Sequence, residues 1–163
     1  MAQRRTKAPA VPTPGAALPT DHSLFFKLVR LVNLTARPFV EQLSRPHRLT
    51  LNEWRTMLVL ASHPGVAARE VADHTGLDKM SVSRALTGLA REGRVERAPD
   101  PADARRMRLW LSPAGLALFR TIGQSGMQRE RTLFAGIAAD EQAQLHATVD
   151  RLLERLSAEA PRG

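Results

Sequence analysis

The fold is decided by the stretch from Asp78 to Ser112, which has the sequence DKMSVSRALTGLAREGRVERAPDPADARRMRLWLS. Asp78 predicts the start of a helix, because its carboxylate can accept the free backbone N–H groups of a first turn. Apolar residues then recur at helical spacing, at Val82, Ala85, Leu86 and Leu89. Gly93 is typical of the residue that follows the end of a helix.

The other face of this helix carries cations and short hydroxyl groups. Such a face suits the major groove of DNA, because small side chains allow a close approach and arginine can bond both acceptors of a guanine. The alternative is that these side chains are simply solvated. The residues predicted to contact DNA here are Lys79, Met80, Ser81, Ser83, Arg84 and Thr87.

A two-stranded hairpin is predicted after this helix. In its second strand Met107, Leu109 and Leu111 alternate with polar or outward-facing residues, and a period of two marks a strand with one buried face. The loop from Ala98 to Arg105 contains Asp-Pro-Ala-Asp and ends in arginine. A hairpin with arginine at its tip, beside a helix with a groove-facing surface, predicts a winged helix-turn-helix.

At these residues the chain also resembles the MarR family of bacterial transcriptional regulators. The motif VSRAL-x-x-L-x-x-x-G-R-V-x-R is followed by D-P-x-D-x-R and by a strand ending in L-x-L-S. The resemblance continues through LTLNEWRTMLVLA before the motif and SPAGLALF after it, so it covers nearly the whole chain beyond residue 20. It implies a DNA-binding regulator, commonly a repressor, whose terminal helices interleave with those of a second subunit.

The resemblance also implies roles for residues of the hairpin. Arg105 matches the arginine of the family's D-x-R motif, whose side chain enters the minor groove, where narrow A/T-rich segments attract it. Asp103 is expected to pair with an arginine and to hold the tip of the hairpin. Arg106 and Arg108 are either phosphate contacts or solvated residues of the strand. Trp110 is expected to pack against the helix that follows.

Two shorter helices are predicted before the groove-facing one. Residues 50–53, Thr-Leu-Asn-Glu, form a capping box and open a helix that extends to about Ser62. The inner side of that helix is expected to carry Trp54, Met57, Leu58 and Ala61. Residues 67–74 form the first helix of the helix-turn-helix, and Gly76 permits the tight turn after it.

Three long amphipathic segments bracket this core. One spans residues 21–43 and contains Pro38, which should kink or divide it. Two follow the hairpin, at residues 113–137 and 140–156, and Ser112 is a clear start for the first of them. Their apolar stripes need a cover. A two-fold homodimer supplies one, and it holds two recognition helices about 34 Å apart, on an inverted-repeat operator.

The predicted fold class is therefore mainly α with a small β wing. The chain is expected to have four parts. They are a disordered basic arm at 1–20, an N-terminal dimerisation helix at 21–48, a winged helix-turn-helix DNA-binding domain at 49–112, and C-terminal dimerisation helices at 113–160. The arm is rich in proline and alanine, and it either adds phosphate contacts or is a solubilising tail.

Composition agrees with a nucleic-acid partner. The 163 residues carry a net charge of +8, which favours double-stranded DNA over a membrane surface as the polyanion bound. The absence of cysteine excludes disulfides and thiolate metal sites and fits a cytoplasmic protein, and no run is apolar enough to span a membrane. We expect no cofactor, no metal site among the dispersed histidines and, without a nucleophile–base constellation or phosphate loop, no enzymatic activity.

The resemblance implies a small-molecule effector, aromatic or anionic, bound in a cleft between the dimerisation helices and the winged core. Its binding would favour a spacing of the recognition helices that no longer fits the operator. The candidate lining residues, each with the alternative of a solvated side chain, are Lys27, Arg30, Asn33, Trp54 and His63. Two other functions stay open: an architectural DNA-binding protein without an effector, and a protein-interaction dimer whose winged domain has lost DNA binding.

Overall fold

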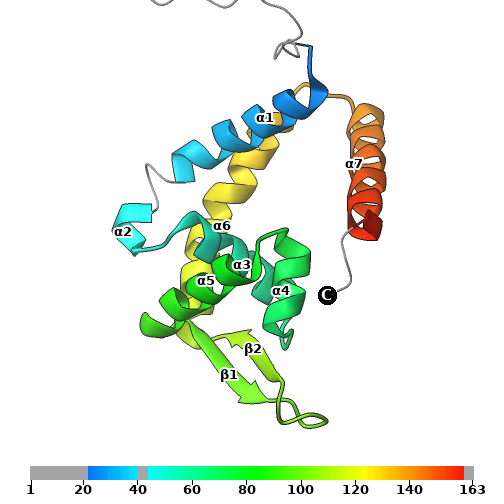
Figure 1. Cartoon of the computed structure of the whole chain (residues 1–163). Helices are drawn as coiled ribbons and strands as arrows, with labels where there is room; N and C mark the ends of the chain where they lie inside the picture. Colours follow the sequence, from blue (N-terminus) through cyan, green and yellow to red (C-terminus); the bar gives the residue numbers. More distant parts are fainter. Residues whose placement is uncertain (1–21, 40–43, 160–163) are drawn as a thin grey trace, which may run out of the picture. The chain divides into compact units, whose positions relative to one another are not determined.

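The computed structural model describes residues 22–39 and 44–159, and Figure 1 labels the helices and strands. These elements are α1 (Leu24–Pro38), α2 (Arg45–His47), α3 (Leu51–Ser62), α4 (Ala68–Thr75), α5 (Lys79–Arg91), β1 (Val95–Pro99), β2 (Met107–Leu111), α6 (Pro113–Phe134) and α7 (Ala139–Glu159). The chain divides into two units, Met1–Leu51 and Asn52–Gly163. The predicted fold class, mainly helical with one small wing, is confirmed.

The first unit contains α1, a helix with an uncovered apolar stripe. It begins after Ser23, whose side chain accepts a hydrogen bond from the N–H of Phe26 at 3.2 Å. It runs to Pro38, and Phe39 after it keeps a helical backbone, with φ −60° and ψ −49°. The predicted continuation to residue 43 falls on residues 40–43, which lie outside the described residues.

The second unit has its core where α3, α4 and α5 meet. The predicted stripe of α5 is confirmed, since Val82, Ala85, Leu86 and Leu89 are all buried. Val71 of α4 and Met57 of α3 are buried against the same core. Each fully buried side chain of this size contributes about 1.5–3 kcal/mol, so this core is the main source of stability in the unit.

The inner face of α3 lies one residue away from the face that the sequence predicts. Leu58 was expected inside but is 42% exposed, whereas Glu53 and Thr56 are buried. Two polar residues therefore complete the i, i+3, i+4, i+7 pattern, which hydrophobic periodicity alone does not detect. Glu53 fits because Gly88 of α5 has no side chain, and a Cβ added there would meet the Glu53 carboxylate.

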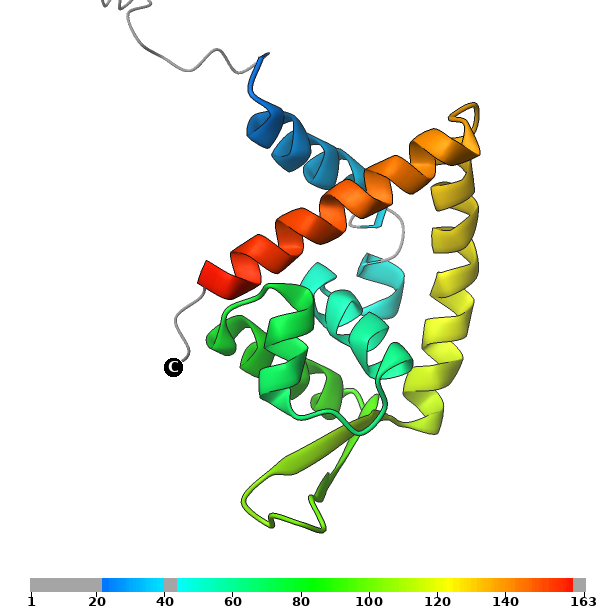
Figure 2. The same cartoon turned by 90° about the vertical axis from the view of Figure 1, so that its right-hand side faces the viewer.

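The wing is an antiparallel hairpin anchored on the helical core. Its register pairs Val95 with Leu111, and Leu109 exchanges backbone hydrogen bonds with Gly65 and Val66, in the loop between α3 and α4. β1 extends to Pro99, so the loop begins two residues later than predicted. Met107 was expected on the buried face but is exposed, because this end of the hairpin projects beyond the core (Figures 1 and 2).

After the wing, α6 (yellow) runs away from the core, and α7 (orange to red) turns back from its far end (Figure 2). The predicted start of α6 is confirmed: Ser112 Oγ accepts from the N–H of Gly115 at 3.0 Å and donates to the carbonyl of Gly93 at 2.7 Å. α6 ends at Phe134, three residues before the predicted end, and Gly136 turns the chain with a φ of +85°. Among the described residues no helix has both the length and the apolar character needed to cross a membrane.

Candidate nucleic-acid interface

The exposed face of α5 is positioned by a strong N-terminal cap. Asp78 accepts the N–H of Ser81 at 2.8 Å and the hydroxyl of Ser81 at 2.6 Å. These two hydrogen bonds, the hydroxyl first, hold the pKa of the Asp78 carboxyl below its ordinary value. The carboxylate therefore fixes the first turn of α5, the turn from which recognition helices contact base edges.

The residues predicted for this face project from the helix as expected, with one qualification. Met80 is 65% exposed, and Lys79, Ser83, Arg84 and Thr87 are also exposed. Ser81 is half-buried, and its hydroxyl donates to Asp78, so its role in the cap is established by geometry. Contact between any of these residues and DNA remains a prediction.

A turn at Gly76 joins the two helices of the motif, α4 and α5. Gly76 has a φ of +67°, in the left-handed region that glycine adopts at little cost. At the other end of α4, the N–H of Ala67 donates to the Glu70 carboxylate at 2.8 Å. Ala67 has no side-chain acceptor, so only this half of a capping box is formed.

The tip of the wing is organised by two aspartates. Asp100 is 7% exposed, and its carboxylate accepts the N–H of Ala102 and the Nε of Arg108, both at 2.8 Å. Asp103 accepts the N–H of Arg105 at 3.0 Å. The hydrogen bond from Arg108, followed by that from Ala102, holds the pKa of the Asp100 carboxyl below its ordinary value.

The expected ion pair of Asp103 is wrong: the aspartate that pairs with an arginine is Asp100. Asp103 does hold the tip, but through the backbone N–H of Arg105 and not through a guanidinium group. The first aspartate of the D-P-x-D motif, Asp100, is the sequence signal for this ion pair. Arg105 is exposed and, within the part of the chain that the structure describes, has no carboxylate within salt-bridge distance.

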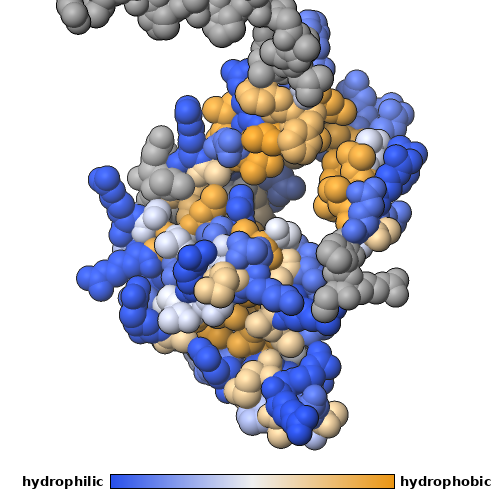
Figure 3. Space-filling model, viewed as in Figure 1, coloured by the Kyte–Doolittle hydropathy of each residue, from blue (hydrophilic) through white to orange (hydrophobic). Residues whose placement is uncertain are grey.

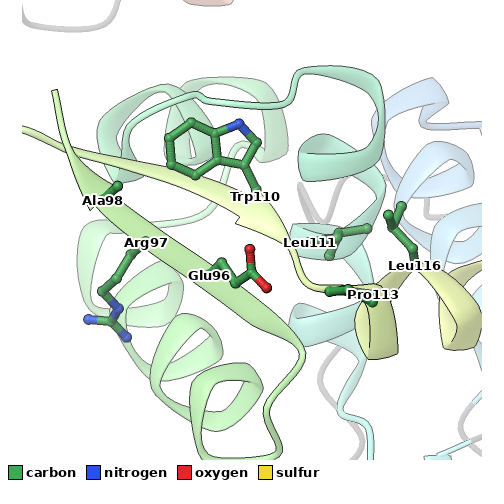
Figure 4. Close-up of a pocket in the computed structure, with 7 residues that line it drawn as sticks. All are labelled: Glu96, Arg97, Ala98, Trp110, Leu111, Pro113 and Leu116. Carbon is green, nitrogen blue, oxygen red and sulfur yellow. The ribbon is translucent and has the colours of Figure 1, made fainter. Parts of the chain in front are cut away.

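Behind the wing lies a hollow of about 710 Å³ that Figure 4 shows from close by. Glu96 and Trp110, which are paired across the strands, line it together with Pro113 and Leu116 of α6. The contact that the structure gives Trp110 is with Gly65, where an added Cβ would lie 3.4 Å from the indole nitrogen. Trp110 thus packs on the loop between α3 and α4, and it borders the same hollow as Pro113 and Leu116 of α6.

A second cavity, of about 550 Å³, lies between α3 and α6. Its aromatic wall is formed by Trp54 and Phe119, stacked with ring centroids 5.5 Å apart. Gly123 and Gly126 open the space, since an added Cβ at either position would meet no atom within 4 Å. The lining residues are Trp54, Leu58, Phe119, Arg120, Gly123, Gln124, Gly126, Met127 and Glu130.

Of the five residues predicted for an effector pocket, Trp54 lines this cavity. Lys27, Arg30 and Asn33 are exposed on α1. His63 lies elsewhere, with its ring stacked on that of His74 at a centroid distance of 4.2 Å. The two glycines three residues apart in α6 were the sequence signal for the cavity.

Comparison with known proteins agrees with this geometry. A sequence model of the MarR family matches residues 47–106. An HTH-type transcriptional repressor of Mycobacterium tuberculosis is 26% identical over 142 residues, which are 87% of this chain and 99% of the relative. The transcriptional regulator PcaV of Streptomyces coelicolor, solved with its natural ligand, is similar with a TM-score of 0.72 and 26% identity, over 86% of this chain and 98% of PcaV.

A further solved structure has the same fold. BpsR of Bordetella bronchiseptica, whose DNA binding is regulated by 6-hydroxynicotinic acid, is similar with a TM-score of 0.67 and 21% identity, over 86% of this chain and 96% of BpsR. Sequence motif, helix-turn-helix, wing and terminal helices thus agree in order and position. Residues 47–106 thus form a winged helix-turn-helix of the MarR family of transcriptional regulators.

Proposed function

We propose that this chain represses transcription by binding an inverted-repeat operator as a homodimer, and that an aromatic acid releases it from the DNA. The observation that carries the DNA-binding part is the exposed polar face of α5 beside a wing whose tip carries Arg105. α5 packs on β1, so these two surfaces belong to one rigid element.

In this proposal α5 enters the major groove and the wing reaches the adjacent minor groove. Arg84 is the residue of α5 best suited to bond a guanine, and Ser83 and Thr87 allow the helix to approach closely. Arg105 enters the minor groove, where a narrow A/T-rich segment offers the most negative potential. The excess of positive charge supplies sequence-independent affinity for the phosphates.

Dimerisation is supported by the uncovered stripe of α7. Leu145, Val149, Leu152, Leu153 and Leu156 are all at least 38% exposed, and Figure 3 shows apolar side chains (orange) on this helix. α1 likewise exposes large apolar side chains, of which Phe25 is 78% exposed. Contiguous apolar surface of this kind marks an interaction site. A second copy of the chain is the proposed partner, with 21–48 and 113–160 as the dimerisation segments.

Effector binding is assigned to the cavity between α3 and α6. The Trp54 and Phe119 rings offer flat apolar faces, and Arg120 at the rim offers a charge for a carboxylate. A planar aromatic acid needs both features. The 6-hydroxynicotinic acid that regulates BpsR belongs to this chemical class.

Selection from a random duplex pool tests the DNA-binding proposal. We expect the bound sequences to converge on an inverted repeat whose half-sites are about 10 base pairs apart. The variant Arg84→Ala/Arg105→Ala serves as the matched control and should select no motif. Convergence on a single unrepeated half-site, or convergence by the control variant, would refute the proposal.

Fluorescence of Trp54 tests the effector site. In a Trp110→Phe background Trp54 is the only tryptophan, so its quenching reports ligand in the cavity. We expect 6-hydroxynicotinate or benzoate to quench it and Gly126→Leu, which fills the open space, to abolish the effect. The matched control Ser125→Leu places the same side chain one residue away on α6, at an exposed position that does not line the cavity, and should bind normally. Quenching that survives Gly126→Leu would contradict this assignment.

A further inference from the structure

The arginines at the end of the wing differ in the partners that the structure gives them. Arg108 Nε lies 2.8 Å from Asp100 Oδ2, and Arg106 Nη2 lies 3.7 Å from Glu70 Oε2. Arg105, next to them in the sequence, has no such partner in the described part of the chain. Two of the three cations are therefore partly neutralised by the protein itself.

The pair between Asp100 and Arg108 is the stronger of the two. Its separation is that of a short charge-assisted hydrogen bond, and Asp100 is buried and fixed by the N–H of Ala102. The backbone N–H of Asp100 also donates to the carbonyl of Arg106 at 2.8 Å. The aspartate is therefore held in place and cannot move with the Arg108 side chain if that side chain turns toward DNA. The pair of Arg106 is longer and its groups are about half exposed, which makes it worth little.

A carboxylate that holds a guanidinium group occupies the place that a DNA phosphate would take. Each cation that contacts a phosphate adds affinity for every duplex, whatever its sequence, through the release of counterions. Affinity of this kind raises binding to competing sites as much as to the operator. Neutralising one cation of the wing thus lowers non-specific binding while Arg105 stays available for the minor groove.

We propose that Asp100 limits the sequence-independent affinity of the wing for DNA: it withholds Arg108 from the phosphate backbone and leaves Arg105 to contact the duplex. This inference rests on the proposed function, in which the wing contacts DNA. It predicts that Arg108, although exposed for 45% of its side chain, makes no phosphate contact in the native protein. A role of Asp100 in the shape of the loop alone predicts no change in the charge presented to DNA.

The test is the salt dependence of binding to a duplex of unrelated sequence. Fluorescence anisotropy of a labelled duplex of about three helical turns is measured between about 50 and 200 mM potassium chloride for four proteins. They are the native chain, Arg105→Gln, Arg108→Gln and Asp100→Asn. The asparagine keeps an acceptor for the N–H of Ala102 and removes the charge that holds Arg108.

The expected slopes differ among the variants. Each phosphate contact contributes about 0.9 to the slope of log affinity against log salt. A cation in the minor groove displaces counterions as well, so Arg105→Gln should reduce the slope by up to about 0.9 for each wing. Arg108→Gln should leave the slope unchanged, because that side chain is already neutralised. Asp100→Asn should gain about 0.9 for each wing and bind unrelated DNA more tightly, and adding Arg108→Gln to it should cancel the gain.

Three results would overturn the inference. They are a reduced slope for Arg108→Gln, an unchanged or reduced slope for Asp100→Asn, and a gain that persists in Asp100→Asn/Arg108→Gln. Equal thermal unfolding midpoints for Asp100→Asn and Arg108→Gln, which break the same pair, show that loss of fold does not explain a difference in slope. A native chain that binds no duplex at about 50 mM salt would instead refute the proposed function itself.

Discussion

The winged core and α7 use the same helical spacing of apolar residues but bury them to different extents. Leu89 of α5 is fully buried, whereas Leu153 and Leu156 of α7 are 57% and 65% exposed. Periodicity thus identifies a helix with an apolar face, and it does not tell what covers that face. In the core the cover is the chain itself. In α7 the single chain leaves Leu153 and Leu156 exposed.

The largest loss of stability is expected where other residues of the same chain bury the apolar side chain. Leu89→Ala removes a fully buried side chain between α5 and its neighbours, and such a cavity costs about 2–5 kcal/mol. Urea unfolding monitored by circular dichroism should show this loss at every protein concentration. A loss below about 0.5 kcal/mol, or one that depends on concentration, would place Leu89 at a subunit interface instead.

Next in size are two glycine substitutions within α6, which begins in the core and continues beyond it. Gly115→Ala should destabilise the fold by about 1–3 kcal/mol or more, because the added Cβ meets the backbone carbonyl of Arg94. Gly123→Ala should stabilise it by about 0.5–1 kcal/mol, since the new Cβ meets no atom and alanine is the better helix former. Thermal unfolding midpoints that move in the same direction for both variants would contradict this difference between the packed start of α6 and its open later part.

The third effect should appear in association and not in the fold of the core. Leu153→Ala and Leu156→Ala remove exposed side chains, each of which gains about 1.5–3 kcal/mol if a partner buries it. Sedimentation equilibrium should therefore show a dimer dissociation constant raised at least tenfold for each variant. The matched control Ala158→Ser, on the same exposed helix, should leave it unchanged. An unchanged dissociation constant for both leucine variants would mean that α7 is not the interface.

The smallest effect is a dependence of stability on pH. The pKa values of Asp78 and Asp100 are lowered in the folded chain by hydrogen bonds from Ser81 and Arg108, so each carboxylate stabilises the fold when it is charged. This contribution is fully present above the unfolded pKa of about 3.9 and is lost as the pH falls through the lower folded values. Urea midpoints at about pH 5 and pH 3 should therefore differ more for the native chain than for Asp78→Asn/Asp100→Asn. An equal difference would show that these two groups do not cause the dependence.

Local signals predicted much of the recognition element correctly. Asp78 caps α5, Ser112 caps α6, and the stripe from Val82 to Leu89 is buried, because each depends on residues within a few positions of one another. These features require only the geometry of one turn or one helix face. The wing was predicted by the same logic, from the alternation in Met107–Leu111.

Contacts between elements were harder to predict. Asp100 and Arg108 meet across the hairpin only because β1 extends to Pro99, and the sequence suggested a loop that starts earlier. His63 and His74 stack although they belong to different segments, so no spacing in the sequence indicates them. The face of α3 was misplaced by one residue because Glu53 and Thr56 are buried polar residues. In each case the position of a side chain depends on a residue from another element, which the local sequence pattern does not indicate.

The stoichiometry of the complex with DNA tests the central claim most directly. Sedimentation velocity of the chain with a duplex that contains one selected inverted repeat measures how many copies bind. Two chains per duplex, with weak binding to a duplex that contains a single half-site, is the predicted result. One chain per duplex, with equal affinity for the full site and the half-site, would contradict the account of two recognition helices held together by the terminal helices.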